Sequence, residues 1–240
     1  MSGLTTYFWK KLKSISFLSK IVTCVYYWLN NNSKKITGIG NTIEINTQGY
    51  FPFLKNVKLE IIGNENNVVI NSGVHLRDLK IFIRGSRHKL IIEEGCYIKS
   101  GCLWFDDDEG KIVIGKGTYI GGAEIGVTEP KSSITIGQDC MLANDIVIIS
   151  GDSHSIIDIK TNTRLNYAKD INIGNHVWIA RYVQILKGVS VGSNSIIGIR
   201  SVVTKDVLEN SVAVGVPAKV ARTGVTWVRE KVYDNNDLNL

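Results

Sequence analysis

The sequence predicts an all-β fold in which short parallel strands stack into a β-helix, and two repeats carry this prediction. In the C-terminal half of the 240-residue chain, an aliphatic residue returns every six positions. The members of this series are Ile173, Ile179, Ile185, Val191, Ile197 and Val203. In the N-terminal half, the segments 68–70, 90–92, 112–114 and 134–136 are in register with a spacing of 22 residues. Helical periodicity explains neither spacing, whereas stacked coils of strands explain both.

The six-residue unit fits a short strand followed by a tight corner. Gly174, Gly192 and Gly198 directly follow three of the repeating aliphatic residues, and glycine tolerates the backbone angles of such corners. Three units make one triangular coil, and stacked coils bury a continuous aliphatic column. The unit of 22 residues is three sixes with four extra residues, and we expect the extra residues to form a bulge that recurs at one corner.

Strand alternation assigns the repeated columns to the inside or the outside of the coils, because residues two apart on a strand face the same way. We expect Cys96 and Cys140 to be small core residues of one inward column. The next inward column contains Leu76, Ile98, Ile120 and Leu142, and the column between them, which should face outward, contains His75, Tyr97, Tyr119 and Met141.

Charge is distributed unevenly along the chain. The net charge is +6, and six lysines but no acidic residue precede Glu44, so the rest of the chain is neutral. A neutral body argues against nucleic-acid binding. The four cysteines lack metal-finger spacing, and the leader lacks a secretory cleavage site. We therefore expect free thiols, no bound metal and a cytoplasmic location.

The basic leader, residues 1–36, is expected to form a separate segment. Residues 4–29 predict an amphipathic helix with an apolar stripe and several aromatic residues. This helix caps the open edge of the first coil, attaches residues 1–35 to the inner face of an anionic membrane, where each basic residue contributes about 1 kcal/mol, or does both. We expect the β-helix over residues 37–218 and a C-terminal helix or tail over residues 219–240.

With these repeats established, residues 134–222 resemble the hexapeptide-repeat acyltransferases, which are left-handed parallel β-helices. Three segments carry the resemblance: 173–179 (IGNHVWI), 201–207 (SVVTKDV) and 215–220 (GVPAKV). The loop 150–154 (SGDSH) and its distance from Trp178 are most similar to O-acetyltransferases of bacterial capsules and lipopolysaccharides, including those acting on sialic acid polymers. The resemblance implies acetyl-coenzyme A as the acyl donor and a sugar hydroxyl as the acceptor.

One long insertion interrupts the repeats. After Ile134 the next unit is expected near residue 156, but the strand pattern resumes at Ile171. The insert of about 15 residues should project as a loop near residues 150–170, and loops on a rigid scaffold commonly carry function. His154 lies in this loop. Because an imidazole with a pKa near ~6.5 can deprotonate an attacking hydroxyl, we predict that His154 is the general base.

Other residues of the predicted chemistry follow from this assignment. No serine or cysteine stands in a recognisable relay with His154, so we expect direct transfer without an acyl-enzyme. Asp152 or Asp158 is a candidate for orienting the imidazole, and Asn144 is a candidate for holding the oxyanion.

The resemblance also implies a homotrimer that binds the donor in a groove between neighbouring subunits. Trp178 matches a position where an aromatic side chain borders the acceptor or donor pocket; packing at a subunit contact is the alternative. The positions that match the wall of the groove and its phosphate contacts are Ala180, Gly198, Thr204, Lys205, Pro217, Lys219 and Arg222.

Two other functions fit the same fold. N-acetylation of an amino sugar nucleotide would use the same base, and a non-catalytic assembly protein would need none. A zinc-dependent carbonic anhydrase would need three histidine ligands, but the sequence offers no HxxxxH pair.

Overall fold

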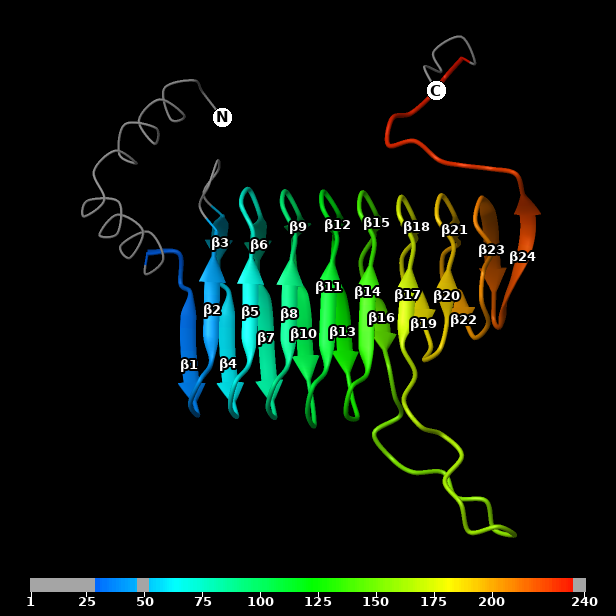
Figure 1. Ribbon diagram of the computed structural model, residues 1–240. Helices are drawn as coiled ribbons and strands as arrows, with labels where there is room; N and C mark the ends of the chain where they lie inside the picture. Colours follow the sequence, from blue (N-terminus) through cyan, green and yellow to red (C-terminus); the bar gives the residue numbers. More distant parts are fainter. Residues whose placement is uncertain (1–28, 47–51, 235–240) are drawn as a thin grey trace, which may run out of the picture.

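The structure, a computed structural model, describes residues 29–46 and 52–234, and these residues form a parallel β-helix (Figure 1). The strands belong to three sheets, here called A, B and C. Neighbours within a sheet come from successive coils and pair in parallel, apart from the antiparallel hairpin that ends sheet C. The predicted all-β, parallel β-helical fold is confirmed.

Each sheet runs along the whole coil stack. Sheet A contains β1 (Ser33–Thr37), β4 (Lys58–Ile62), β7 (Leu79–Arg84), β10 (Gly101–Phe105), β13 (Ala123–Val127), β16 (Ile146–Ile149), β19 (Gln184–Ile185) and β22 (Val202–Val203). Sheet B contains β2 (Thr42–Ile45), β5 (Asn67–Ile70), β8 (Lys89–Ile92), β11 (Lys111–Ile114), β14 (Ser133–Ile136), β17 (Ile171–Ile173) and β20 (Ser190–Val191). Sheet C contains β3 (Phe53–Lys55), β6 (His75–Arg77), β9 (Tyr97–Ile98), β12 (Tyr119–Ile120), β15 (Met141–Leu142), β18 (Trp178–Ile179), β21 (Ile196–Ile197), β23 (Ser211–Gly215) and β24 (Ala218–Thr223).

The core is the stack of inward columns that the repeats predict. Leu76, Ile98, Ile120 and Leu142 follow one another in sheet C, and each is at most 1% exposed. Burial of an aliphatic side chain of this size contributes about 1.5–3 kcal/mol, so the column stabilises the stack along its length. The predicted roles of Cys96 and Cys140 are also confirmed, because both side chains are fully buried in this core.

The two repeat lengths differ at one corner. The chain needs 11 steps from Leu103 in sheet A to Ile114 in sheet B, but only six from Ile185 to Val191. These residues occupy the same two columns, as the strand registers show. The extra residues of the longer unit therefore enlarge the corner between sheets A and B, here called the A–B corner.

Buried polar side chains fill the enlarged A–B corners. His88 is 1% exposed; its Nδ1 accepts a hydrogen bond from the Gly110 amide at 2.9 Å, and its Nε2 lies 3.0 Å from the Asp107 carbonyl oxygen. The amide of His88 in turn donates to Asn66 Oδ1 in the preceding coil. Burial lowers the pKa of His88, which favours its neutral form. His88 therefore has a packing role.

The insertion arises at the same A–B corner. Sheet A ends at Ile149 in this coil and sheet B resumes at Ile171, which pairs with Ile134. Residues 150–170, here called the excursion, extend away from the coils (Figure 1). The predicted projecting loop is confirmed.

The C-terminal end of the chain differs from its prediction, and residues 1–28 of the N-terminal leader lie outside the described residues. β24 pairs antiparallel with β23 and closes the last coil, so the chain continues as a strand to Thr223, where a helix or tail was expected from residue 219. Residues 224–234 continue as an irregular tail. The amphipathic leader lies outside the described residues at positions 1–28, and its cap and membrane roles stay predictions. Among the described residues, none belongs to a helix with the length and apolar character needed to span a bilayer.

Candidate active site

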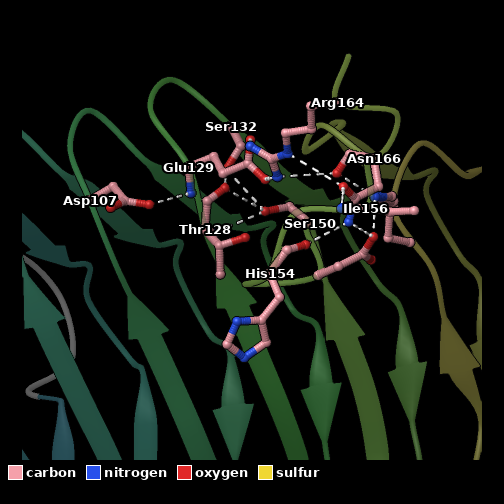
Figure 2. Close-up of polar contacts among 11 residues, drawn as sticks. Asp107, Thr128, Glu129, Ser132, Ser150, His154, Ile156, Arg164 and Asn166 are labelled. Atoms are coloured by element: carbon pink, nitrogen blue, oxygen red, sulfur yellow. Dashed lines mark hydrogen bonds and ion pairs between the residues drawn. The ribbon is translucent and has the colours of Figure 1, made fainter. Parts of the chain in front are cut away.

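The base of the excursion is anchored by a buried hydroxyl cluster. Ser150, fully buried at the end of β16, accepts a hydrogen bond from the Thr128 amide at 3.1 Å. Its Oγ also lies 3.0 Å from Ser132 Oγ, which donates to the Thr128 carbonyl at 2.7 Å. These contacts tie the first residue of the excursion to the coil before it (Figure 2).

The returning arm of the excursion is clamped by an ion pair. Arg164 contacts both carboxylate oxygens of Glu129, with Nη1 to Oε2 at 3.1 Å and Nη2 to Oε1. Both side chains are about four-fifths buried, at 22% and 19% exposure. Bidentate pairing gives directional strength, and burial limits screening by solvent. The excursion therefore has a defined position at its exit as well as at its base.

Asn166 links the two arms around His154. This side chain is 8% exposed, and its Nδ2 donates to the His154 carbonyl and to Asp152 Oδ2, both at 2.7 Å. Its Oδ1 accepts from the Ile156 amide at 2.6 Å. A single side-chain amide thus fixes the main chain at His154 and Ile156, as Figure 2 shows.

Asp152 supports His154 indirectly. Its carboxylate accepts hydrogen bonds from Lys187 Nζ and from Asn166 Nδ2. The bond from Lys187 lowers the pKa of Asp152, which is therefore ionised at neutral pH. The expected contact with the imidazole is replaced by these two bonds. Asp158 accepts from the Lys160 and Thr161 amides at 2.8 and 2.9 Å and stabilises its own turn.

The imidazole of His154 projects from the network. His154 is exposed, and Figure 2 shows its ring pointing out of the hydrogen-bonded loop while its backbone is held inside it. A ring held this way is positioned by its main chain and keeps its ring nitrogens available to a ligand.

A second group of predicted residues lies at the corner between sheets C and A, here called the C–A corner. Trp178 pairs with Met141 in sheet C, and the Asn144 carbonyl accepts from the Tyr182 amide at 3.2 Å. Asn144 and Trp178 therefore belong to adjacent coils, which are about 4.8 Å apart. Ala180 and Gly198 occupy one column with Ala143, which directly precedes Asn144. Asn144 also lines an open hollow of about 480 Å³.

The C-terminal tail packs beside Trp178. Trp227, 6% exposed, stacks on His176 with ring centroids 4.2 Å apart and lies 6.2 Å from Trp178. His176 Nδ1 lies 2.8 Å from Asp139, its Nε2 lies 2.9 Å from the Trp227 carbonyl oxygen, and Trp227 Nε1 donates to the His176 carbonyl at 2.7 Å. His176 therefore has a structural role.

The other predicted donor residues are divided between the two corners. Thr204 and Lys205 are exposed at the A–B corner after β22. Pro217 lies in the turn between β23 and β24 at the C–A corner, and Lys219 and Arg222 are exposed on β24 opposite Val214 and Val212.

One chain therefore carries two separate groups of site residues. Asn144 and Ser150 flank β16, and six residues of extended chain span about 20 Å. The group at the A–B corner, where the strands of sheet A end, contains Asp152, His154, Thr204 and Lys205. The group at the opposite edge of sheet A, toward sheet C, contains Asn144, Trp178, Ala180, Gly198 and Pro217. A second subunit would be needed to bring the two groups together.

Comparison with known proteins identifies the family. The crystal structure of the polysialic acid-specific acetyltransferase NeuO is 37% identical, covers 87% of this chain and 94% of its own, and superimposes with a TM-score of 0.78. The chain belongs to the hexapeptide-repeat acyltransferase family. The structure of the polysialic acid O-acetyltransferase OatWY agrees, with 33% identity, coverage of 85% and 96%, and a TM-score of 0.80.

Sequence comparison supports membership over a shorter stretch. The family model "Bacterial transferase hexapeptide (six repeats)" matches residues 170–205 of this acyltransferase. The polysialic acid O-acetyltransferase of Escherichia coli O1:K1 / APEC is 41% identical over 91 residues, which are 38% of this chain and 30% of the relative. The match thus spans less than a third of that curated relative, while the two structural matches span nearly whole chains.

Several residues of the site carried no sequence pattern. Asn166, Arg164 and Lys187 hold the excursion, and Trp227 supports Trp178 across about 50 residues of chain. The excursion has no repeat to fix its register, so the partners of His154 were not predictable from spacing. Across residues 29–46 and 52–234, no three His, Cys, Asp or Glu side chains converge as a metal site would require.

Proposed function

We propose that this protein transfers the acetyl group of acetyl-coenzyme A to a hydroxyl of a sugar in a bacterial surface polysaccharide, with sialic acid polymers as the first candidates. The support is the match over nearly the whole chain to two acetyltransferases whose names specify polysialic acid. The observation that carries the proposal is the exposed imidazole of His154, held through its backbone by Asn166.

His154 acts as the general base in the proposed reaction. Its neutral imidazole accepts the proton of the sugar hydroxyl as the oxygen attacks the thioester carbonyl carbon. The carbonyl oxygen becomes an oxyanion, which the Asn144 side-chain amide stabilises by donating a hydrogen bond. The intermediate then expels the coenzyme A sulfur, which takes the proton from the imidazolium. The products are the O-acetyl ester and free coenzyme A, with no acyl-enzyme.

The proposed site forms between subunits. His154 and Asn144 lie on opposite sides of sheet A, so a homotrimer would join the excursion of one subunit to the C–A corner of its neighbour. Acetyl-coenzyme A would lie along that corner, bordered by Trp178, Ala180 and Gly198. Lys219 and Arg222 of the same subunit, and Lys205 of the subunit that supplies the excursion, would be available to its phosphates.

The test is incubation of the full chain with labelled acetyl-coenzyme A and a panel of glycans that includes polysialic acid, neutral polysaccharides and amino sugar nucleotides. We expect label in polysialic acid, released by mild alkali as an ester is. An alkali-stable amide on an amino sugar nucleotide would favour N-acetylation instead. Absence of transfer to every acceptor would contradict an enzymatic role.

A further inference from the structure

The outer face of sheet C carries a row of stacked aromatic rings in its N-terminal coils. Phe53, His75, Tyr97 and Tyr119 occupy one outward column, with successive ring centroids 5.6, 5.7 and 5.4 Å apart. The rings are half-buried, and their interplanar angles are between 19° and 27°. Because each ring face is covered by the next ring, the row presents its ring edges to a ligand.

A row of basic side chains runs beside the aromatic row. Lys55 pairs with Arg77, and Lys99 follows β9 in the same column. Adjacent strands lie about 4.8 Å apart, so three positive charges stack at that spacing. No ion pair within the described chain involves any of the three. The carboxylate of Asp78, the residue directly after Arg77, accepts a hydrogen bond from the Asn56 side chain and not from the basic row.

Arg77 gives a second indication of a missing partner. Its Nε is buried and makes no hydrogen bond to any described residue. A guanidinium N–H that is withdrawn from water without an acceptor is costly, and an anion at the accessible end of the half-buried guanidinium would offset part of that cost.

The two rows lead toward the Asn144 group of the candidate site. In the following coils the basic column continues with small residues, Gly121, Ala143 and Ala180. Lys99 is followed directly by Ser100, which lines the same open hollow as Asn144. From Lys99 to Ala180 is three coils, or about 14 Å, so one extended polymer can contact both.

We propose that this face of sheet C, the sheet C ridge (Phe53, His75, Tyr97, Tyr119, Lys55, Arg77 and Lys99), binds an acidic polysaccharide with a carboxylate on successive sugars. The carboxylates pair with the basic row, and the sugar rings lie against the aromatic edges. The inference rests on the proposed function only for the identity of the polymer, because charge and geometry are properties of the face itself.

Charge complementarity favours a polymer over a second copy of this chain. A neighbouring subunit would have to present a row of carboxylates to the ridge. In the same coils the outward positions at the start of the strands are Lys58 and Lys80 on sheet A, and Lys89 and Lys111 on sheet B. These rows would repel the ridge, whereas an acidic glycan neutralises it.

The test compares two double variants with equal charge change in the full chain. Lys55→Gln/Lys99→Gln removes two charges from the ridge, and Lys58→Gln/Lys80→Gln removes two from sheet A in the same part of the coil stack. Binding of long polysialic acid and of a sialic acid trimer is measured without acetyl-coenzyme A at several salt concentrations. We expect the ridge variant to bind the polymer about 10-fold to 100-fold more weakly, with a smaller salt dependence by about one to two ions. The control variant should bind as the parent does.

Three other outcomes would contradict polymer binding by the sheet C ridge. Equal loss in both variants would mean that total charge, and not this face, attracts the polymer. Unchanged binding in the ridge variant would exclude the ridge directly, even if the polymer is acetylated. A change in oligomeric mass of the ridge variant, with polymer binding intact, would assign the face to a subunit contact. Polymer binding through the ridge with no acetyl transfer would instead contradict the proposed function alone.

Discussion

The excursion at the A–B corner and the C–A corner hold their site residues by different means. At the C–A corner, Asn144 and Trp178 inherit their positions from the strand register of sheet C, which the buried column of Leu142 and Ile179 fixes. In the excursion, His154 depends on side-chain hydrogen bonds, because residues 151–170 contain no regular strand. Many paired residues maintain the strand register, whereas a few side-chain hydrogen bonds maintain the conformation of the excursion.

The contrast indicates where changes should affect chemistry without affecting the fold. A polar network that supports one loop can fail locally while the coil stack stays folded, since loops open at lower free energies than cores do. A substitution at the C–A corner or in the C-terminal tail (residues 224–234) changes the local surface, but the strands of the β-helix keep the remaining site residues in position. The variants below separate these two behaviours.

The largest effect is expected from His154→Ala. Loss of the proposed base should lower kcat about 100-fold to 10,000-fold, with binding of acetyl-coenzyme A retained because the donor residues belong to other elements. Steady-state kinetics and equilibrium binding measure the two quantities. Lys160→Ala, an exposed change in the same loop, is the control. Equal activity of the His154 variant and the control would contradict the role of the imidazole.

Asn166→Ala should disorder the excursion while leaving the coils intact. The change removes the hydrogen bonds to the Ile156 amide and the His154 carbonyl, which are partly buried, and each lost bond costs about 0.5–1.5 kcal/mol. We expect kcat to fall about tenfold or more, faster proteolysis within residues 150–170 and an almost unchanged Tm. A variant with parental kcat would show that the excursion keeps His154 in place without this amide.

Trp227→Ala tests the packing of the C-terminal tail beside Trp178. Removing the indole takes away the stacking on His176 and the contact with Trp178. An aromatic pair contributes about 0.5–1.5 kcal/mol, so we expect KM to rise about 2-fold to 10-fold with little change in kcat. Tyr233→Ala, which alters an exposed residue of the same tail, is the control. A fall in kcat at constant KM would place Trp227 in the chemistry instead of the binding surface.

The smallest expected effect is the contribution of His88, at an A–B corner of the coils, to the pH dependence of stability. Because burial lowers the pKa of His88 below its unfolded value near 6.5, the unfolded chain binds more protons between those two pKa values. The free energy of unfolding should therefore fall as pH falls through this window. We expect Tm to drop by a few degrees between pH 7.5 and 5.5, and less in His88→Asn. An identical pH slope in that variant would contradict the linkage.

The sequence predicted the fold well because repetition makes it redundant. Each inward position recurs in successive coils, so spacing alone predicted the buried columns that contain Leu76 and Val203. It also predicted the outward row of His75, Tyr97 and Tyr119. The insertion was found for the same reason, since a break in a repeat is easy to locate.

The site was less predictable because its contacts are not periodic. Asp152 or Asp158 was expected to orient the imidazole of His154. The Asp152 carboxylate instead accepts hydrogen bonds from Lys187 and Asn166, which are 35 and 14 residues away, and Asp158 stabilises its own turn. Asn144, the candidate for holding the oxyanion, is separated from His154 of the same chain by β16. Long-range side-chain contacts of this kind depend on how a loop folds back, which spacing does not encode.

The central claim, that one active site draws on two subunits, has a direct test. Co-expressing His154→Ala with Asn144→Ala as tagged chains and purifying the mixed trimers should restore about a third of the parental activity, since a trimer that contains both variants keeps both residues intact at one of its three interfaces. Each variant alone, and trimers of the double variant, should be nearly inactive. Mixed trimers as inactive as either single variant would contradict a site shared between subunits.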